Sequence, residues 1–216
     1  MTPQVSAFRW VPPFAQGLVR DLRVRWALHE AGEAYSERLI GPSDQGSEDY
    51  RRLQPFGQVP AYEEDGLALF ESGAIVLQIA ERSAVLMPQD AHGRARARTW
   101  VFAALNTVEP PIMFLNQLEM MQVAQSNEIR SAVEAAVRRR LANLAEWLDG
   151  RGYLEGSFSA GDLLMTSVLR ILRTTDMVEE FPVLKDYKAR CEARAPFQRA
   201  LADQLATFDA NAPAAA

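Results

Sequence analysis

Apolar residues recur along the chain with two different periods. Near the N-terminus, short apolar runs typical of strands alternate with runs at helical spacing, whereas the chain after about residue 90 is helical in character throughout. The first part therefore predicts the order strand, helix, strand, helix, strand, strand, helix. These elements are expected at 5–10, 17–30, 34–40, within 42–53, on either side of Asp65-Gly66, and at 71–82.

The stretch from Phe56 to Ile75 is the most informative part of this region. Asp65-Gly66 predicts a hairpin turn, because Gly accepts the positive φ that such turns need. Pro60 has no N–H to donate, so it belongs at the start or edge of a strand, and a Pro there can mark a cis bond. Ser72 can cap the helix that follows the hairpin.

The remaining residues predict a set of helices. A long helix is expected from Ala91 to about Gln122, with a break or kink at Pro110-Pro111. The clearest amphipathic helix covers 126–149, where apolar residues recur in steps of three and four. Those apolar positions are Ile129, Val133, Val137, Leu141, Leu144 and Leu148, and the last helices are expected at 183–194 and 196–206.

A capping box opens the helix between these groups. Ser159 can accept a hydrogen bond from the main chain near Asp162, and Asp162 can accept one from the main chain of Ser159. Phe158 can pack on Leu163 as a hydrophobic staple. The sequence therefore predicts a firmly started helix at this point.

Composition narrows the classes of function. The chain has 216 residues, 48% of them hydrophobic, with a net charge of −5 from 23 basic and 28 acidic residues. An acidic chain argues against nucleic-acid binding, and no apolar run reaches the length of roughly 20 residues that spans a bilayer. A single cysteine excludes an internal disulfide framework, and two histidines make a metal site unexpected. The expected compartment is the cytoplasm.

The ordered combination of Gln58-Val59-Pro60, the hairpin and Glu71-Ser72 resembles the glutathione-binding half of the glutathione S-transferase superfamily. The Ser159-x-x-Asp162 box is a second, independent match in the later part. The resemblance implies an N-terminal thioredoxin-like α/β domain followed by an all-α helical-bundle domain. Its boundaries would be 1–83 for the first domain, 84–90 for a linker, 91–206 for the second domain and 207–216 for a disordered tail.

The same resemblance implies a glutathione site at Gln58, Val59, Pro60, Glu71 and Ser72. In that family the Pro is cis and the cysteinyl part of glutathione pairs with the main chain before it. Elementary chemistry agrees, because an open main-chain edge can take an extended peptide and a helix N-terminus can receive a carboxylate. Glu71 can pair with an ammonium group, and Gln58 would reach the glycyl carboxylate.

The thiol-activating group of the family is missing from its usual places. It is commonly a Tyr after the first strand or a Ser or Cys at the first helix, but residues 7–34 contain no Ser, Thr, Cys or Tyr. Three substitutes are open: the main-chain amides near Gly17 and Leu18, the indole of Trp10, and the charge of Arg20 or Arg23. A Trp at such a position is more often a core residue or a pocket wall, and arginines on a helix are more often surface or salt-bridged residues.

An acceptor pocket is expected between the two domains. Its candidates by position are Phe14, Asn106, Glu109 and Met113, although aromatic and Met residues at helical spacing are also typical of plain core. The predicted function is conjugation of glutathione, as co-substrate, to a hydrophobic small molecule by a homodimer, with Phe56 a possible interface residue. The alternatives are a non-catalytic binding or regulatory protein and a glutathione-dependent reductase, which would need a first-helix cysteine that is absent.

Overall fold

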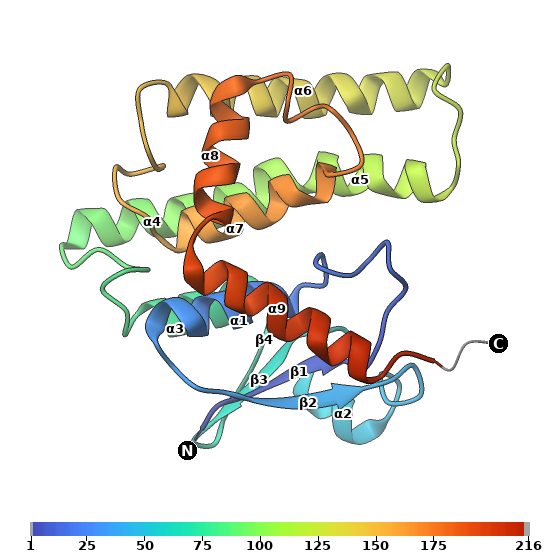
Figure 1. Cartoon of the computed structure of the whole chain (residues 1–216), viewed down its shortest axis with the longest axis vertical. Helices are drawn as coiled ribbons and strands as arrows, with labels where there is room; N and C mark the ends of the chain where they lie inside the picture. The colour runs from blue at the N-terminus through green and yellow to red at the C-terminus, as the bar shows by residue number, and fades with distance from the viewer. Residues whose placement is uncertain (1, 214–216) are drawn as a thin grey trace. The chain divides into compact units, whose positions relative to one another are not determined.

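The computed structural model describes residues 2–213, which fall into two units (Figure 1). Unit 1 comprises the residues up to Leu86 and those from Arg194 onward, and unit 2 runs from Met87 to Ala193. This division corrects the expectation that 196–206 belongs to the second domain. The last helix, α9 (Ala195–Ala210), packs on the first helix of the chain, where the rings of Trp26 and Phe197 meet edge to face at 4.8 Å.

Unit 1 is built on a four-stranded mixed sheet. The strand order is β2-β1-β3-β4, with β1 parallel to β2 and the other neighbours antiparallel. Asp65 and Gly66 have φ of 48° and 83°, so both residues of the hairpin turn adopt the positive φ of a type I′ turn. The strands are β1 (Gln4–Phe8), β2 (Ser36–Ile40), β3 (Ala61–Glu64) and β4 (Leu67–Phe70).

The edge strand β4 is more exposed than its alternating sequence predicts. Leu67 and Phe70 are 41% and 37% exposed, and Leu69 is half-buried. The pattern indicates a half-buried strand, but β4 has a neighbour on only one side. Its apolar side chains therefore lie partly in solvent.

Helices cover both faces of this sheet. Figure 1 shows α1 (Asp21–Ala31) and α3 (Ser72–Ala80) on one face, with α2 (Glu48–Leu53) on the opposite face. This is the expected thioredoxin-like arrangement. The first helix begins at Asp21 rather than at Gly17, because residues 17–20 form turns.

The helix α1 is buried on all sides rather than along a stripe. Leu22, Val24, Trp26 and Leu28 are at most 4% exposed. The reason is that α3 and the sheet cover one side and α9 covers another. Its charged residues are buried too, and they are paired, as the 2.7 Å contact between Arg25 Nε and the Asp21 carboxylate shows.

The longer regular elements of unit 2, within residues 87–193, are all helices. The expected break near Pro110-Pro111 is present, since a π-helical turn, η1 (Ala104–Val108), joins two α-helices there. Both prolines lie in the first turn of the second helix, where a missing N–H costs little. The helices are α4 (Ala91–Ala103), α5 (Glu109–Met120), α6 (Glu128–Leu148), α7 (Ala160–Leu169), η2 (Arg170–Leu172) and α8 (Pro182–Glu192).

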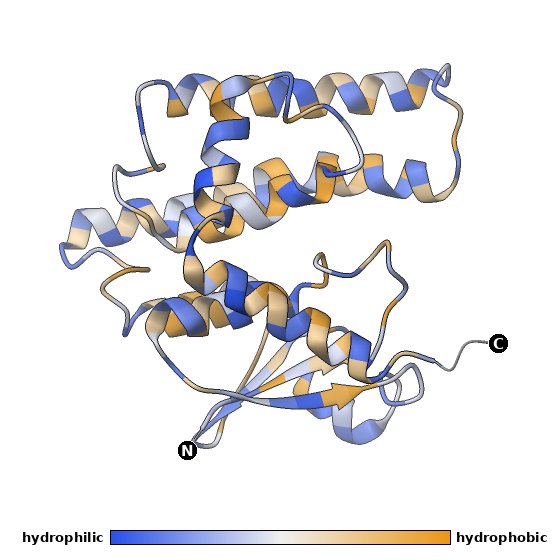
Figure 2. Cartoon of the chain, viewed as in Figure 1, coloured by the Kyte–Doolittle hydropathy of each residue, from blue (hydrophilic) through white to orange (hydrophobic). Residues whose placement is uncertain are grey.

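The amphipathic pattern of α6 holds with one exception. Figure 2 shows hydrophilic and hydrophobic bands alternating along this helix. Val133, Val137, Leu141, Leu144 and Leu148 are buried, as their spacing predicts. At the start of the helix, Ile129 was expected to be buried with them but is 60% exposed.

The capping box at the start of α7 is confirmed. The Asp162 carboxylate accepts from the Ser159 N–H at 3.0 Å, and it also accepts from the Leu154 N–H and the Tyr187 hydroxyl. Asp162 and Ser159 are both buried, so their hydrogen bonds are shielded from water. This cluster fixes where the central helix of unit 2 begins.

The end of the chain is more ordered than expected. A disordered tail from residue 207 is corrected by α9, which continues to Ala210 with Phe208 only 1% exposed and Thr207 bonded to Glu37. Residues 214–216 of the expected tail lie outside the described residues. Among the helices within residues 2–213, none has both the length and the apolar character needed to cross a bilayer.

Candidate functional site

The register of the β3–β4 hairpin brings the two halves of the expected glutathione site together. Ala61 pairs with Phe70 at the open end of the hairpin. Pro60 precedes Ala61 and Glu71 follows Phe70, so these two residues lie side by side. The strand β1 runs antiparallel to β3, so the C-terminal end of β1 lies at the same end of the sheet as Pro60. Trp10 follows β1 at that end of the sheet.

The main chain before Pro60 is open. The Val59–Pro60 peptide bond is cis, and the Val59 side chain is 8% exposed in a cluster with Tyr50, Ile40 and Ala61. Within residues 2–213, no hydrogen bond engages the N–H or C=O of Val59. A buried side chain and an unused main-chain edge are what strand addition by an extended peptide requires.

A chain of hydrogen bonds holds this loop from behind. The Ala61 N–H donates to Ser6 Oγ at 2.6 Å, Ser6 and Tyr50 hydroxyls lie 2.7 Å apart, and the Tyr50 hydroxyl donates to the Gln58 carbonyl at 2.6 Å. Burial raises the pKa of Tyr50, partly offset by the Ser6 bond and the Arg38 charge, so its hydroxyl keeps its proton. Sequence reasoning missed Tyr50 because nothing local marks it as a loop anchor.

Gly57 sets the path of the loop just before Gln58, whose carbonyl accepts the Tyr50 hydrogen bond. Its φ is +64°, and a Cβ there would come within 2.5 Å of the Gln45 carbonyl oxygen. The Gln45 side chain in turn donates to the Gly57 carbonyl at 2.8 Å. Only glycine fits this position, so the residue before Gln58 is defined by sterics.

The start of α3 differs in detail from the expectation. Ser72 does not cap the helix; it is the first helical residue, and Glu71 holds the cap position with φ +69° and no side-chain cap bond. Such a φ costs a non-glycine residue of order 1–3 kcal/mol, and it turns the chain sharply from β4 into α3. Glu71 is exposed, whereas Ser72 is 5% exposed.

The N-terminus of α3 offers donors to a ligand. No residue within 2–213 accepts from the main-chain N–H of Ser72 or Gly73. The Ser72 Oγ itself accepts a hydrogen bond from Arg23 Nη1 at 3.3 Å. Arg23 is 4% exposed, so of the two ordinary alternatives for this residue, a surface position or a salt bridge, the surface position is excluded.

The amides expected to receive the thiolate are already engaged. The Gly17 N–H donates to Gln204 Oε1 at 3.1 Å, and the Leu18 N–H donates to the Ala15 carbonyl at 3.0 Å. Gln204 comes from α9 and also donates to the Val19 carbonyl at 3.2 Å. The expectation that the Gly17 and Leu18 amides bind the thiolate is therefore corrected.

Trp10 keeps its place as a candidate donor. It follows β1, is half-buried, and has no hydrogen bond from its indole N–H to any residue within 2–213.

The acceptor-pocket candidates are divided between the units. Phe14 is 65% exposed in unit 1, whereas Asn106 is exposed, Glu109 buried and Met113 half-buried in unit 2, so the acceptor pocket stays a prediction.

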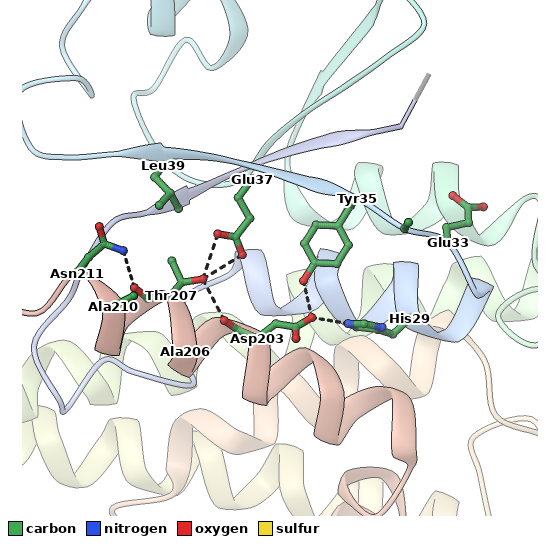
Figure 3. Close-up of a pocket in the computed structure, with 11 residues that line it drawn as sticks. His29, Glu33, Tyr35, Glu37, Leu39, Asp203, Ala206, Thr207, Ala210 and Asn211 are labelled. Atoms are coloured by element: carbon green, nitrogen blue, oxygen red, sulfur yellow. Dashed lines mark hydrogen bonds and ion pairs between the residues drawn. The ribbon is translucent and has the colours of Figure 1, made fainter.

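Apart from the candidate site, a hollow with a volume of about 660 Å³ lies between α1, β2 and α9 in unit 1 (Figure 3). Its polar groups contact one another: Asp203 lies 2.7 Å from His29 Nε2 and accepts from the Tyr35 hydroxyl at 2.9 Å. Thr207 donates to Glu37 at 3.0 Å. The polar side chains of the hollow are hydrogen-bonded to one another, so we interpret the hollow as part of the contact that holds α9 against α1 and β2.

Comparison with known proteins identifies the family. Residues 16–81 match the profile of the glutathione S-transferase N-terminal domain, and residues 102–195 match that of the C-terminal domain. The chain belongs to the glutathione S-transferase superfamily, which confirms the resemblance found in the sequence. The two-part fold, thioredoxin-like then helical, is confirmed with it.

Individual relatives are distant. The chain is 27% identical to the glutathione S-transferase-like protein gedE of Aspergillus terreus, over 87% of this chain and 92% of that protein. It is 28% identical to the disulfide-bond oxidoreductase YfcG of Escherichia coli, over 53% of this chain and 59% of that protein. A crystal structure of a Burkholderia graminis glutathione transferase with two bound glutathione molecules per subunit is 26% identical, with a TM-score of 0.80 over 93% of this chain and 87% of that one.

Removing the Tyr50 hydroxyl tests the loop anchor. We expect Tyr50→Phe to lower the free energy of unfolding by about 1–2 kcal/mol, because the Gln58 carbonyl and the Ser6 hydroxyl lose a buried partner. Urea unfolding at neutral pH measures this. Because burial raises the pKa of Tyr50, the contribution is complete below pH of about 10 and declines as the pH rises further.

The matched control is Tyr153→Phe in unit 2, whose ring packs on Phe158 at 5.6 Å. We expect this control to change the free energy of unfolding by less than about 0.5 kcal/mol. Equal effects of the two substitutions would show that the hydroxyl of Tyr50 has no special role in the loop.

Proposed function

We propose that the protein is a glutathione transferase that conjugates glutathione to a hydrophobic electrophile. The observation that supports this most is the juxtaposition of an unused main-chain edge at Val59 with the start of α3 at Glu71 and Ser72. The first can take the cysteinyl part of an extended tripeptide, and the second can take its γ-glutamyl end. The glutathione bound in the Burkholderia graminis relative is in keeping with this proposal.

Each part of glutathione has a proposed partner. The ammonium of the γ-glutamyl group pairs with exposed Glu71, and its carboxylate accepts from Ser72 at the positive end of the α3 dipole. The cysteinyl main chain pairs with Val59 beside Pro60. Gln58, also exposed, donates to the glycyl carboxylate, more weakly than a Lys or Arg would.

The chemistry needs the thiol of glutathione as a thiolate, because the thiolate is the nucleophile. Trp10 is the proposed donor, since its indole N–H donates to no residue within 2–213. It also follows β1 at the end of the sheet where Pro60 lies. The thiolate sulfur would form a bond to the electrophilic carbon while the leaving group departs with the electron pair. Phe14, Asn106, Glu109 and Met113 are the proposed contacts of the electrophile.

A non-catalytic glutathione-binding protein is the alternative function. It is favoured by the lack of any Ser, Thr, Cys or Tyr in residues 7–34 and by the engaged Gly17 and Leu18 amides. Turnover of a chloronitrobenzene with glutathione separates the two functions. Binding of glutathione without any turnover across several electrophile classes would select the alternative.

Calorimetric titration with glutathione tests the binding site. We expect Ser72→Ala to weaken binding by about 10-fold or more, because a hydrogen bond to a charged carboxylate is worth about 1.5–3 kcal/mol. Ser131→Ala, an exposed position on α6, is the control and should bind as the unaltered protein does. A failure of the unaltered protein to bind glutathione would contradict the proposal.

The thiol of bound glutathione tests the role of Trp10. We expect its pKa in the complex to lie below that of free glutathione, and to rise in Trp10→Phe, because the replacement loses the indole donor and keeps an aromatic ring. Thiolate ultraviolet absorbance against pH measures both values. The same pKa in the two complexes would exclude Trp10 as the activating group.

We propose further that the chain works as a homodimer through an apolar patch formed by Phe56 and Phe70. These rings are 64% and 37% exposed and meet edge to face with centroids 6.1 Å apart. Light scattering should give twice the chain mass for the unaltered protein and a mass near that of one chain for Phe56→Ser. Met121→Ser, at a 73% exposed position of unit 2, is the control, and monomeric unaltered protein would refute this proposal.

A further inference from the structure

The loop between β1 and α1 is bound by a side chain of the last helix. Residues 11–20 of this loop form turns rather than a strand or a helix. Main-chain hydrogen bonds such as that from the Leu18 N–H to the Ala15 carbonyl, at 3.0 Å, join residues of the loop to one another. Bonds of this kind curl the loop but do not fix where it lies relative to the sheet.

Gln204 of α9 supplies contacts that fix the later half of the loop. Its side chain is fully buried, and it lies 187 positions beyond Gly17 in the sequence. Its amide oxygen accepts from the Gly17 N–H at 3.1 Å. Its amide nitrogen donates to the Val19 carbonyl at 3.2 Å and to Asp21 Oδ1 at 2.7 Å. All of these residues belong to unit 1.

We propose that Gln204 is a positioning residue of the candidate site, which keeps Trp10 at the end of the sheet where Pro60 lies by holding the loop at Gly17 and Val19. This inference rests on the proposed function, in which Trp10 donates to the thiolate of glutathione. Gln204 acts through Trp10 and is not itself a catalytic residue.

A second side-chain contact connects Gly17 to Trp10. Gln16, the residue before Gly17, donates from Nε2 to the Val11 carbonyl at 3.1 Å. Val11 follows Trp10 directly, so the neighbours of Gly17 and of Trp10 are joined across the loop. The contact that Gln204 makes at Gly17 therefore restrains the main chain next to Trp10.

The three contacts of Gln204 require a primary amide. Gly17 presents a donor, whereas Val19 and Asp21 present acceptors. A glutamine has one oxygen that accepts and an NH2 group with two hydrogens, so its amide matches this set. A glutamate in its place would set a carboxylate against two acceptors, and an apolar residue would leave these buried polar groups without this partner.

The first test follows the loop in the protein without ligand. We expect Gln204→Met, which keeps the length of the side chain and loses the amide, to speed amide hydrogen exchange in residues 11–20 about 10-fold or more. The controls on α9 are Gln198→Met, at an exposed position, and Thr207→Val, which removes the hydrogen bond to Glu37 (Figure 3). Unaltered exchange in Gln204→Met, or equal acceleration in Thr207→Val, overturns the proposal.

The second test measures the pKa of the thiol of bound glutathione. We expect Gln204→Met to raise this pKa by about 0.5 or more, because the indole donor is no longer held beside the sulfur. In the Trp10→Phe background the same substitution should change the pKa by less than about 0.2, since the donor is already gone. Thr207→Val should leave the pKa unchanged even where urea unfolding shows a loss of stability.

A purely structural role for Gln204 predicts a different result. Its effect on the thiol would then be independent of the indole, so equal rises of the pKa in the two backgrounds overturn the proposal. No rise in either background overturns it as well.

Should Gln204→Met fail to fold, Gln16→Met decides. This substitution removes the contact with the Val11 carbonyl and leaves those of α9 in place. It should raise the thiol pKa when Trp10 is present and not in the Trp10→Phe background, and an unchanged pKa overturns the proposal.

The proposed function and the role of Gln204 fail in distinguishable ways. Absence of glutathione binding by the unaltered protein overturns both. Normal binding of glutathione, with a thiol pKa that does not depend on Gln204, overturns only the positioning role.

Discussion

Three hydrogen bonds in series tie the segment on either side of the cis Val59–Pro60 bond to β1 and α2. The amide of Ala61 can only donate and the carbonyl of Gln58 can only accept, so the hydroxyls of Ser6 and Tyr50 between them have fixed directions. Polar groups behind the loop are thereby satisfied. The main chain of Val59 has no such partner within residues 2–213 and is left available at the front. The candidate site depends on this one-sided arrangement.

Much of the fold and half of the site could be predicted from the sequence, because their signals are local. Asp65-Gly66 determines its own turn, and Ser159 and Asp162 form their own capping box within one helical turn. Pro60 and Glu71 are specified by their positions next to paired strand residues. Such features need no knowledge of distant parts of the chain, so pattern and spacing were sufficient for them.

The features that sequence reasoning missed all depend on distant partners. The charge of Arg23 is typical of a helix surface. The helix α1 is covered on several sides, however, so the Arg23 side chain is buried. The Gly17 amide was expected at an open helix start, but Gln204 reaches it from α9, 187 positions later. Tyr50 acts through a carbonyl beyond the end of its own helix. No window of sequence contains both members of these pairs.

The assignment of α9 to unit 1 has a consequence for how the protein is made. A ribosome delivers β1 to α3 first, then the whole of unit 2, and only then the segment from Arg194 that covers Trp26 and satisfies the Gly17 amide. Unit 1 is therefore completed only after the whole of unit 2 has been translated. Until the segment from Arg194 emerges, the first helix of unit 1 presents an apolar flank and buried charges without their cover, which makes this interval the period of greatest exposure to aggregation and the natural point for chaperone contact.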